Sequence, residues 1–281
     1  MKLIADSGST KTDWCLISAG QEVCKFVTEG YNPFFVDSKY IFESLGNSIP
    51  QFVDTSKISE VIFYGAGCQD EKKALVADAL EQFFPGVALQ VEVDLLAAAR
   101  GLLQKEAGFV AILGTGTNTC TYDGVQIDQQ IESLGFLMGD EGSGSYMGRK
   151  ILSDYIRGRM PEKARKLFYQ EYKKTPVVVM DEVYSTPLPN RYCANYVLFL
   201  NHPDMDKAYS EGVIRDSFHE FFQNLVSAYP DFRSLIFNCV GSVGYYYADM
   251  LRETADAFGM ETGAIVPNLI DHLVAYHLHD N

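Results

Sequence analysis

The chain has 281 residues, of which 47% are hydrophobic and 21% are charged, and its formal net charge is -14. This length can bury the cores of two modest domains, and the composition is that of a globular protein. The acidic balance argues against a nucleic-acid surface, which needs clustered Lys and Arg. The absence of a run of about 18 apolar residues argues against a membrane span.

The first hundred residues predict three strands followed by alternating helices and strands. The expected strands are 2–6, 13–18, 23–28, 61–64 and 87–93, and the expected helices are 39–49, 70–84 and one that begins at Asp94. A loop is expected at Gly30-Tyr31-Asn32-Pro33, where Gly and the Asn-Pro step interrupt regular structure. Strands joined through helices cross over and run parallel, so the order indicates an α/β fold.

A strand at 109–114 restarts the pattern, which places a domain boundary near residue 105 and predicts domains at 1–105 and 106–281. The second domain is longer because it carries a helical insertion. Its expected helices are 141–159, 161–172, 191–201, 211–229, 245–258 and 268–277, and its later strands are 235–240 and 264–266.

The six cysteines are widely scattered and none forms a C-x-x-C pair, so we expect buried, reduced thiols and no zinc or iron-sulfur site. The N-terminus carries charged residues early and has no apolar signal region. We therefore expect a cytoplasmic protein.

Two turns rich in Gly, Ser and Thr follow apolar strands about a hundred residues apart. They read Gly8-Ser9-Thr10-Lys11-Thr12 and Gly114-Thr115-Gly116-Thr117-Asn118-Thr119. Glycine allows a ligand to approach the backbone closely, and successive N–H groups with hydroxyls bind anions. The repetition predicts a duplicated fold with a phosphate-binding turn in each half.

Several further segments strengthen this interpretation: DSGSTKTDW at 6–14, VDLLAAAR at 93–100, LGTGTNT at 113–119, GFLMGDEGS at 135–143 and CVGSVG at 239–244. With these motifs in this order, the chain resembles the N-acetylglucosamine kinases that are grouped with the BadF/BadG/BcrA/BcrD-type ATPases. The resemblance implies an α/β protein of two ribonuclease H-like (actin-like ATPase) domains with a central interdomain cleft. It also implies that the final helix, 268–281, packs on the first domain.

In the first half, the resemblance assigns four kinds of contact. Asp6 holds Mg²⁺, usually through water. Asp94 is the general base that accepts the sugar hydroxyl proton. Asp94 also stands at a position expected of a helix N-cap. The β- and γ-phosphates are bound by Gly8, Ser9, Thr10 and Lys11. A sugar contact is expected from Asn32. Purely structural roles stay open: capping for both aspartates, a solvated hairpin tip for Lys11, and a loop role for Asn32.

In the second half, the resemblance assigns phosphate binding to Thr115, Gly116 and Thr117, and sugar binding to Asn118, Asp140 and Gly144. Adenosine is expected at Gly241 and Ser242, where a strand passes into a helix. The structural alternatives are a plain hairpin, an acidic first helical turn at Asp140 and Glu141, and an ordinary strand-to-helix turn.

The resemblance thus implies a kinase that uses ATP and Mg²⁺ and transfers the γ-phosphate to an amino-sugar hydroxyl, N-acetylglucosamine at C6 first among them. Close relatives carry a sugar-facing Trp where this chain has Leu134, so glucosamine, a muramic-type sugar or another amino sugar stays open. The expected partners are the amino sugar and ATP, and a homodimer is compatible with the sequence. Two alternatives remain: an ATPase that activates an electron-transfer partner, and a non-catalytic sensor of sugar or nucleotide.

Overall fold

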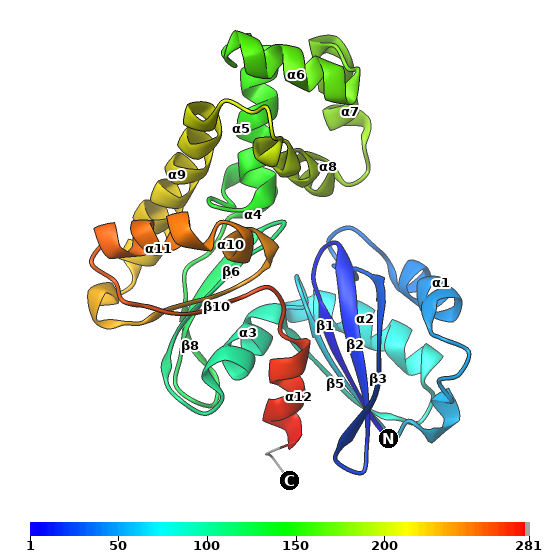
Figure 1. The fold of residues 1–281 in the computed structure, drawn as a ribbon. Helices are drawn as coiled ribbons and strands as arrows, with labels where there is room; N and C mark the ends of the chain where they lie inside the picture. Colours follow the sequence, from blue (N-terminus) through cyan, green and yellow to red (C-terminus); the bar gives the residue numbers. More distant parts are fainter. Residues whose placement is uncertain (279–281) are drawn as a thin grey trace. The chain divides into compact units, whose positions relative to one another are not determined.

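The computed structural model describes residues 1–278, which divide into two compact units (Figure 1). The first unit comprises Met1–Gly108, Thr121–Asp128 and the segment from Asn268 onward, and the second comprises Phe109–Cys120 and Gln129–Pro267. Residues 279–281, the end of the expected helix 268–281, lie outside the described residues. Within residues 1–278, no helix has the length and apolar character to cross a membrane.

The first unit is built on a five-stranded sheet in the order β3-β2-β1-β4-β5. Its strands are β1 (Lys2–Ser7), β2 (Lys11–Ser18), β3 (Gln21–Glu29), β4 (Glu60–Gly65) and β5 (Ala88–Val93). β2 is antiparallel to both β1 and β3, whereas β4 is parallel to both β1 and β5. The carboxyl ends of β1, β4 and β5 therefore meet at one edge of the sheet, the edge at which parallel α/β sheets bind ligands.

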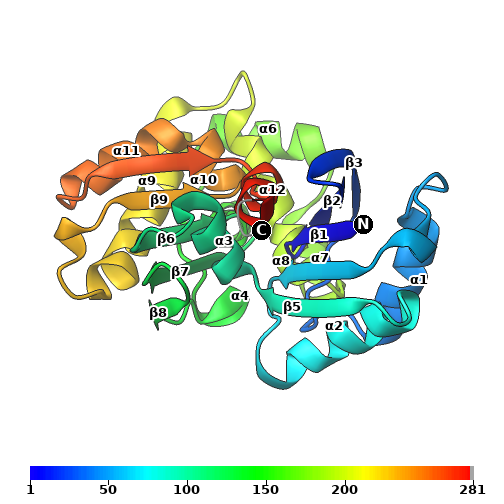
Figure 2. The same ribbon diagram turned by 90° about the horizontal axis from the view of Figure 1, so that it is seen from below.

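Helices cover both faces of this sheet. α1 (Ser38–Ser48) and α2 (Asp70–Phe83) pack on one face, where alternate strand residues such as Leu3 and Ala5 join a buried apolar core. α3 (Asp94–Leu103) and α12 (Ile270–Leu278) cover the other face and lie side by side (Figure 2). On that face, Arg100 of α3 donates to the Tyr64 hydroxyl at 2.9 Å, and the same hydroxyl lies 3.0 Å from Nε2 of His277.

The second unit repeats this sheet. Its order is β10-β9-β6-β7-β8, so β6, β7, β8, β9 and β10 occupy the places that β1 to β5 occupy in the first sheet. The strands are β6 (Gly108–Leu113), β7 (Thr117–Tyr122), β8 (Ile127–Gln130), β9 (Phe237–Val240) and β10 (Thr262–Val266). β9 is parallel to both β6 and β10, as β4 is to β1 and β5. The predicted duplication is confirmed.

The helices of the second unit fill the long stretch between β8 and β9 and follow β9. They are α4 (Gly135–Met138), α5 (Gly144–Ile156), α6 (Glu162–Tyr172), α7 (Pro176–Ser185), α8 (Pro189–Asn195), α9 (Lys207–Asn224), α10 (Ser242–Tyr246) and α11 (Ala248–Ala257). Short 3-10 turns occur in this unit at Tyr196–Asn201, Val226–Ala228 and Phe232–Ser234, and in the first unit at Thr55–Lys57. Fully buried Phe168, Phe218, Phe221 and Phe222 contribute to the core.

Four expected helices differ from the structure. The helix expected at 191–201 is α8 followed by the 3-10 turn Tyr196–Asn201, and the one expected at 211–229 is α9, which begins at Lys207 and ends at Asn224. The helix expected at 141–159 begins only at Gly144, because Asp140 (φ 61°) and Gly142 (φ 77°) have left-handed backbones that cannot continue a helix. Asp140 and Glu141 are therefore in a turn, and the acidic first helical turn is wrong. The helix expected at 245–258 begins at Ser242 and is interrupted at Tyr247.

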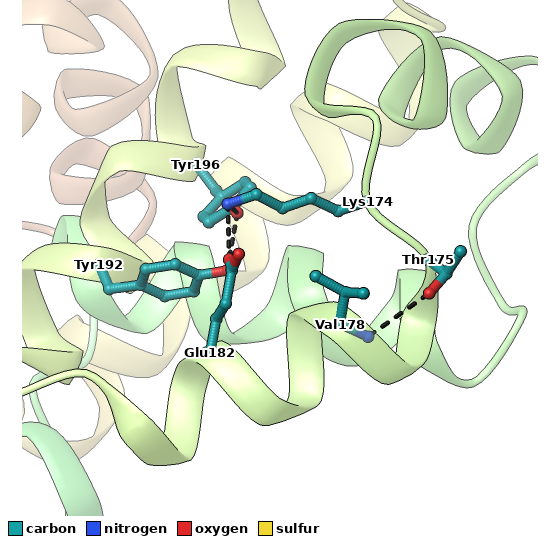
Figure 3. A network of polar contacts seen from close by, with 6 residues as sticks. All are labelled: Lys174, Thr175, Val178, Glu182, Tyr192 and Tyr196. Carbon is teal, nitrogen blue, oxygen red and sulfur yellow. Dashed lines mark hydrogen bonds and ion pairs between the residues drawn. The ribbon is translucent and has the colours of Figure 1, made fainter.

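A polar network fastens α7 to α8 and to the turn that follows it (Figure 3). The Lys174 ammonium donates to Glu182 at 2.6 Å and to the Tyr196 hydroxyl at 3.2 Å, and the Tyr192 hydroxyl donates to Glu182 at 2.6 Å. The Lys174 ammonium also lies 5.3 Å from the Tyr192 ring centroid. We predicted no element at residues 176–185, and this network shows that α7 is an integral part of the helical region.

Candidate functional site

The turn between β1 and β2 is held closed by its own backbone. Gly8 N–H donates to the Lys11 carbonyl at 2.9 Å, and Gly30 N–H donates to the Thr10 carbonyl at 3.1 Å. A Cβ on Gly30 would lie 2.6 Å from the Thr10 nitrogen, so only glycine permits this approach. The Lys11 ammonium pairs with Asp13 at 2.7 Å. The result is a rigid turn with Gly8, Thr10 and Lys11 exposed at its tip.

Two half-buried carboxylates stand at the same sheet edge as this turn. Asp6 is near the end of β1, and Asp94 directly follows β5 as the first residue of α3. The expected N-cap role of Asp94 is wrong, because Val93 occupies that position. A carboxylate in the first turn still interacts favourably with the helix dipole.

Burial perturbs both carboxylates, and repulsion from Asp94 also acts on Asp6. Burial, with repulsion from Asp94 next in size, raises the pKa of Asp6 to about 7. Burial raises the pKa of Asp94 to about 6, against the lowering effect of the two backbone N–H groups. A divalent cation would relieve the repulsion that acts on Asp6, so Asp6 fits Mg²⁺, which prefers oxygen ligands and keeps several waters. Within residues 1–278, no group of three or more His, Cys, Asp or Glu side chains could hold a metal.

Asn32 is brought against the first turn. Its buried amide donates to the Ser9 hydroxyl at 3.0 Å and accepts from the Phe34 N–H at 3.0 Å. A Cβ on Gly67 would lie 2.6 Å from the Asn32 amide oxygen, so the loop after β4 approaches the same group closely. Asn32 therefore has the structural role that the sequence left open, and one of its amide hydrogens is still available for a ligand.

In the second unit, the turn between β6 and β7 is fixed by the start of α5. Gly114 N–H donates to the Gly116 carbonyl at 3.1 Å, which closes the turn. Gly144 N–H and Ser145 N–H in turn donate to the carbonyls of Gly114 at 2.8 Å and Thr115 at 3.0 Å. The structure thus brings together the predicted phosphate-binding turn and the predicted sugar-binding residue Gly144.

Asp140 joins this cluster through its carboxylate. One oxygen accepts from the Thr117 N–H at 3.2 Å and the other from the Ser145 hydroxyl at 3.5 Å. A Cβ on Gly116 would lie 3.2 Å from each of these oxygens. Burial raises the pKa of Asp140 to about 6, opposed chiefly by the Thr117 hydrogen bond and by the charge of Arg149. Asp140 is therefore buried, fixed in direction, and ionised at neutral pH.

The remaining predicted residues of this unit lie on both sides of the β6–β7 turn. The Asn118 amide oxygen accepts from the Thr119 N–H at 3.0 Å and from Gln130 at 3.1 Å, which ties it to β8. Gly241 has φ 125°, and a Cβ there would lie 3.1 Å from the Gly114 nitrogen. Ser242 follows it as the exposed first residue of α10. The Gly241 turn is thus in close contact with the β6–β7 turn.

No protein-family model and no curated protein matches the chain. Among solved structures, a candidate N-acetylglucosamine kinase from Porphyromonas gingivalis is 36% identical, with a TM-score of 0.91, over 100% of this chain and 99% of that one. The chain belongs to the N-acetylglucosamine kinase and BadF/BadG/BcrA/BcrD-type ATPase family. A second candidate N-acetylglucosamine kinase, from Chromobacterium violaceum, is 16% identical, with a TM-score of 0.72, over 99% of this chain and 98% of that one.

More distant likeness concerns the fold alone. A glucokinase of the ROK family from Streptomyces griseus, solved with glucose and AMPPNP, is 15% identical, with a TM-score of 0.60, over 98% of this chain and 97% of that one. Membership of the family and these fold neighbours confirm the expected pair of ribonuclease H-like, actin-like ATPase domains.

Arg149 lies beside the predicted site residue Asp140, and no role for it was predicted from the sequence. Arg149 of α5 donates to the carbonyls of Leu137 at 3.2 Å and Gly139 at 2.6 Å, and its charge acts on Asp140. Its partners are backbone carbonyls, which every residue type carries, so no motif could have indicated the contact.

Proposed function

We propose that this protein is an ATP-dependent sugar kinase that transfers the γ-phosphate of MgATP to a hydroxyl of an amino sugar, with N-acetylglucosamine at C6 as the first candidate. The observation that carries the proposal is the position of Asp94. It is a half-buried carboxylate at the carboxyl edge of parallel strands, in the same unit as Asp6 and the Gly8–Lys11 turn. Membership of the family supports the same reaction.

Asp94 would act as the general base. Phosphoryl transfer leaves a protein little covalent work, so one oriented carboxylate that accepts the proton of the attacking hydroxyl is sufficient. Burial raises the pKa of Asp94 to about 6, which leaves it ionised at neutral pH but more basic than an exposed aspartate. Asp94 lies in the first turn of α3, where backbone N–H groups lower its pKa and favour the ionised form.

The phosphates of ATP would be bound by main-chain and hydroxyl donors. In the first unit these belong to Gly8, Ser9 and Thr10, with the Lys11 ammonium as an additional charge. Asp6 would hold Mg²⁺ through water, and the ion, when bound, neutralises phosphate charge. In the second unit, phosphate binding is assigned to Thr115, Gly116 and Thr117, and adenosine to Gly241 and Ser242.

The sugar would be recognised by Asn32, Asn118, Asp140 and Gly144. An ionised carboxylate has about four acceptor positions, and the Asp140 carboxylate uses two of them within the protein. Two therefore remain for sugar hydroxyls, whose O–H groups make strong hydrogen bonds to an ionised acceptor.

An ADP-release assay over a panel of hexoses and hexosamines tests this proposal. We expect ADP release that depends on one amino sugar and on Mg²⁺, with little release when the sugar is omitted. ADP release that no sugar stimulates would contradict the kinase and favour an ATPase activator, and the absence of any turnover would favour a sensor.

A further inference from the structure

We propose that Arg149 is a positioning residue of the sugar site, because its guanidinium holds the peptide bond between Gly139 and Asp140 and so directs the Asp140 carboxylate. This inference rests on the proposed function, in which Asp140 contacts the sugar.

The guanidinium of Arg149 binds the end of α4. Nη2 donates to the Gly139 carbonyl at 2.6 Å, and Nη1 donates to the Leu137 carbonyl at 3.2 Å. Carbonyls at a helix C-terminus have no partner within the helix and need an external donor. The planar guanidinium supplies two donors at a fixed spacing, which an ammonium cannot reproduce.

The peptide group that Arg149 holds is restrained at both ends. Its carbonyl, from Gly139, accepts from Arg149, and its N–H, from Asp140, donates to the Ser133 carbonyl at 2.9 Å. A Cβ on Gly139 would overlap that same carbonyl of Ser133, so the chain approaches itself closely here. The plane of this peptide bond is therefore fixed.

This restraint matters because Asp140 has an unfavourable backbone. Its φ of 61° lies in the left-handed region, which is costly for a residue other than glycine and persists only where the surroundings impose it. From this backbone the carboxylate reaches Thr117 and Ser145. Rotation of the preceding peptide would turn the two unused acceptor positions of the carboxylate away from the sugar.

Arg149 is itself fixed by two aromatic rings. Its guanidinium carbon lies 5.1 Å from the Phe136 ring centroid and 5.3 Å from the Tyr146 ring centroid. Burial lowers the pKa of Arg149, whereas the charge of Asp140 raises it. In return, Arg149 lowers the pKa of Asp140, and Glu141 raises it. The same side chain therefore has a geometric effect and an electrostatic effect on Asp140, and the two can be separated.

Three variants separate these effects. Arg149→Met removes both the geometric and the electrostatic effect, whereas Arg149→Lys keeps the charge but loses the paired donors. Arg165→Met, on the exposed face of α6, is the matched control. We expect Arg149→Met to raise the KM for the sugar about tenfold or more, as loss of a charge-assisted hydrogen bond does, while the KM for ATP stays within about twofold. We also expect the acid limb of the sugar kcat/KM to move to higher pH. Arg149→Lys should keep the wild-type pH profile but show a raised sugar KM, and Arg165→Met should match the wild type.

Melting temperatures of all variants are measured alongside the kinetics. An unchanged sugar KM in Arg149→Met and Arg149→Lys would overturn the inference even if both melt at lower temperature, because the residue would then be only structural. Equal increases in the KM values for sugar and ATP would overturn it as well. Wild-type protein without sugar-dependent turnover would contradict the proposed function itself, and the inference would fall with it before any variant is assayed.

Discussion

Replacing Asp140 by Asn separates the cost of burying a carboxylate from its use in binding sugar. The side chain of Asp140 is 6% exposed, and burial raises its pKa from 3.8 to about 6. Asn has nearly the same shape, tolerates the left-handed backbone of this position, and can still accept from the Thr117 N–H. The substitution should therefore preserve the local structure while it removes the charge.

The sign of the stability change follows from proton binding. The unfolded carboxyl loses its proton near pH 3.8 and the folded one near pH 6, so the folded state binds more protons between these values and loses stability as the pH rises. The penalty reaches about 3 kcal/mol at pH 7.5 and is about half as large at pH 5, because each unit of pKa corresponds to about 1.4 kcal/mol. The amide of the variant has no charge to bury, so Asp140→Asn should gain up to these amounts.

Urea unfolding at pH 7.5 and pH 5, together with steady-state kinetics, measures the two effects. We expect Asp140→Asn to be more stable than the wild type, with about half the gain at pH 5, and to lose roughly 10- to 100-fold in kcat/KM for the sugar, as expected when a charged acceptor is removed. The KM for ATP should change little. A variant that is equally or less stable at pH 7.5, or a gain that does not depend on pH, would refute the reasoning.

Three further substitutions test other parts of the structure. Asp6→Asn should raise the Mg²⁺ concentration needed for half-maximal turnover by roughly tenfold; unchanged Mg²⁺ dependence would exclude Asp6 as the metal ligand. Gly30→Ala should lower stability by about 1–3 kcal/mol in urea unfolding and raise the KM for ATP, because its Cβ would overlap the β1–β2 turn; wild-type values would show that the turn can yield. Tyr192→Phe should cost about 1–2 kcal/mol of stability through its lost bond to Glu182 without altering either KM; an unchanged unfolding curve would show that the network is not stabilising.

Most strands of both sheets were predictable because apolar runs such as Val61–Tyr64 stand between clear turn residues. The exception is β8, whose sequence IDQQ is mostly polar and was not predicted as a strand. Helix α7 was not predictable from the sequence, because its three consecutive valines at 177–179 favour a strand locally. Only Thr175, the N-cap, and Pro176, the first helical residue, indicate a helix. The helix is stabilised by the contacts that Lys174 and Glu182 make with the tyrosines of the following elements. Local preference is overridden there by tertiary packing.

The candidate site also combines features that the sequence indicates with contacts that it does not. Asp6 lies near the end of the first apolar strand and Asp94 follows the strand expected at 87–93, so their place at one sheet edge was predictable, because parallel strands end at one edge. Their roles were expected from the family resemblance. The contacts of Asp140 with Thr117 and Ser145 depend on a left-handed turn, which the spacing of glycines suggests only in outline. The contact between Arg149 and Gly139 involves a backbone carbonyl, so it carries no sequence signal.

The most direct test of the account is ³¹P NMR detection of the product formed from ATP, Mg²⁺ and N-acetylglucosamine by the wild type and by Asp94→Asn. We expect a sugar 6-phosphate with the wild type and, with the variant, a rate lowered about a hundredfold or more while ATP binding is retained. A variant that forms the phosphosugar at the wild-type rate would contradict the role of Asp94. The absence of phosphosugar from every amino sugar tried with the wild type would contradict the account as a whole.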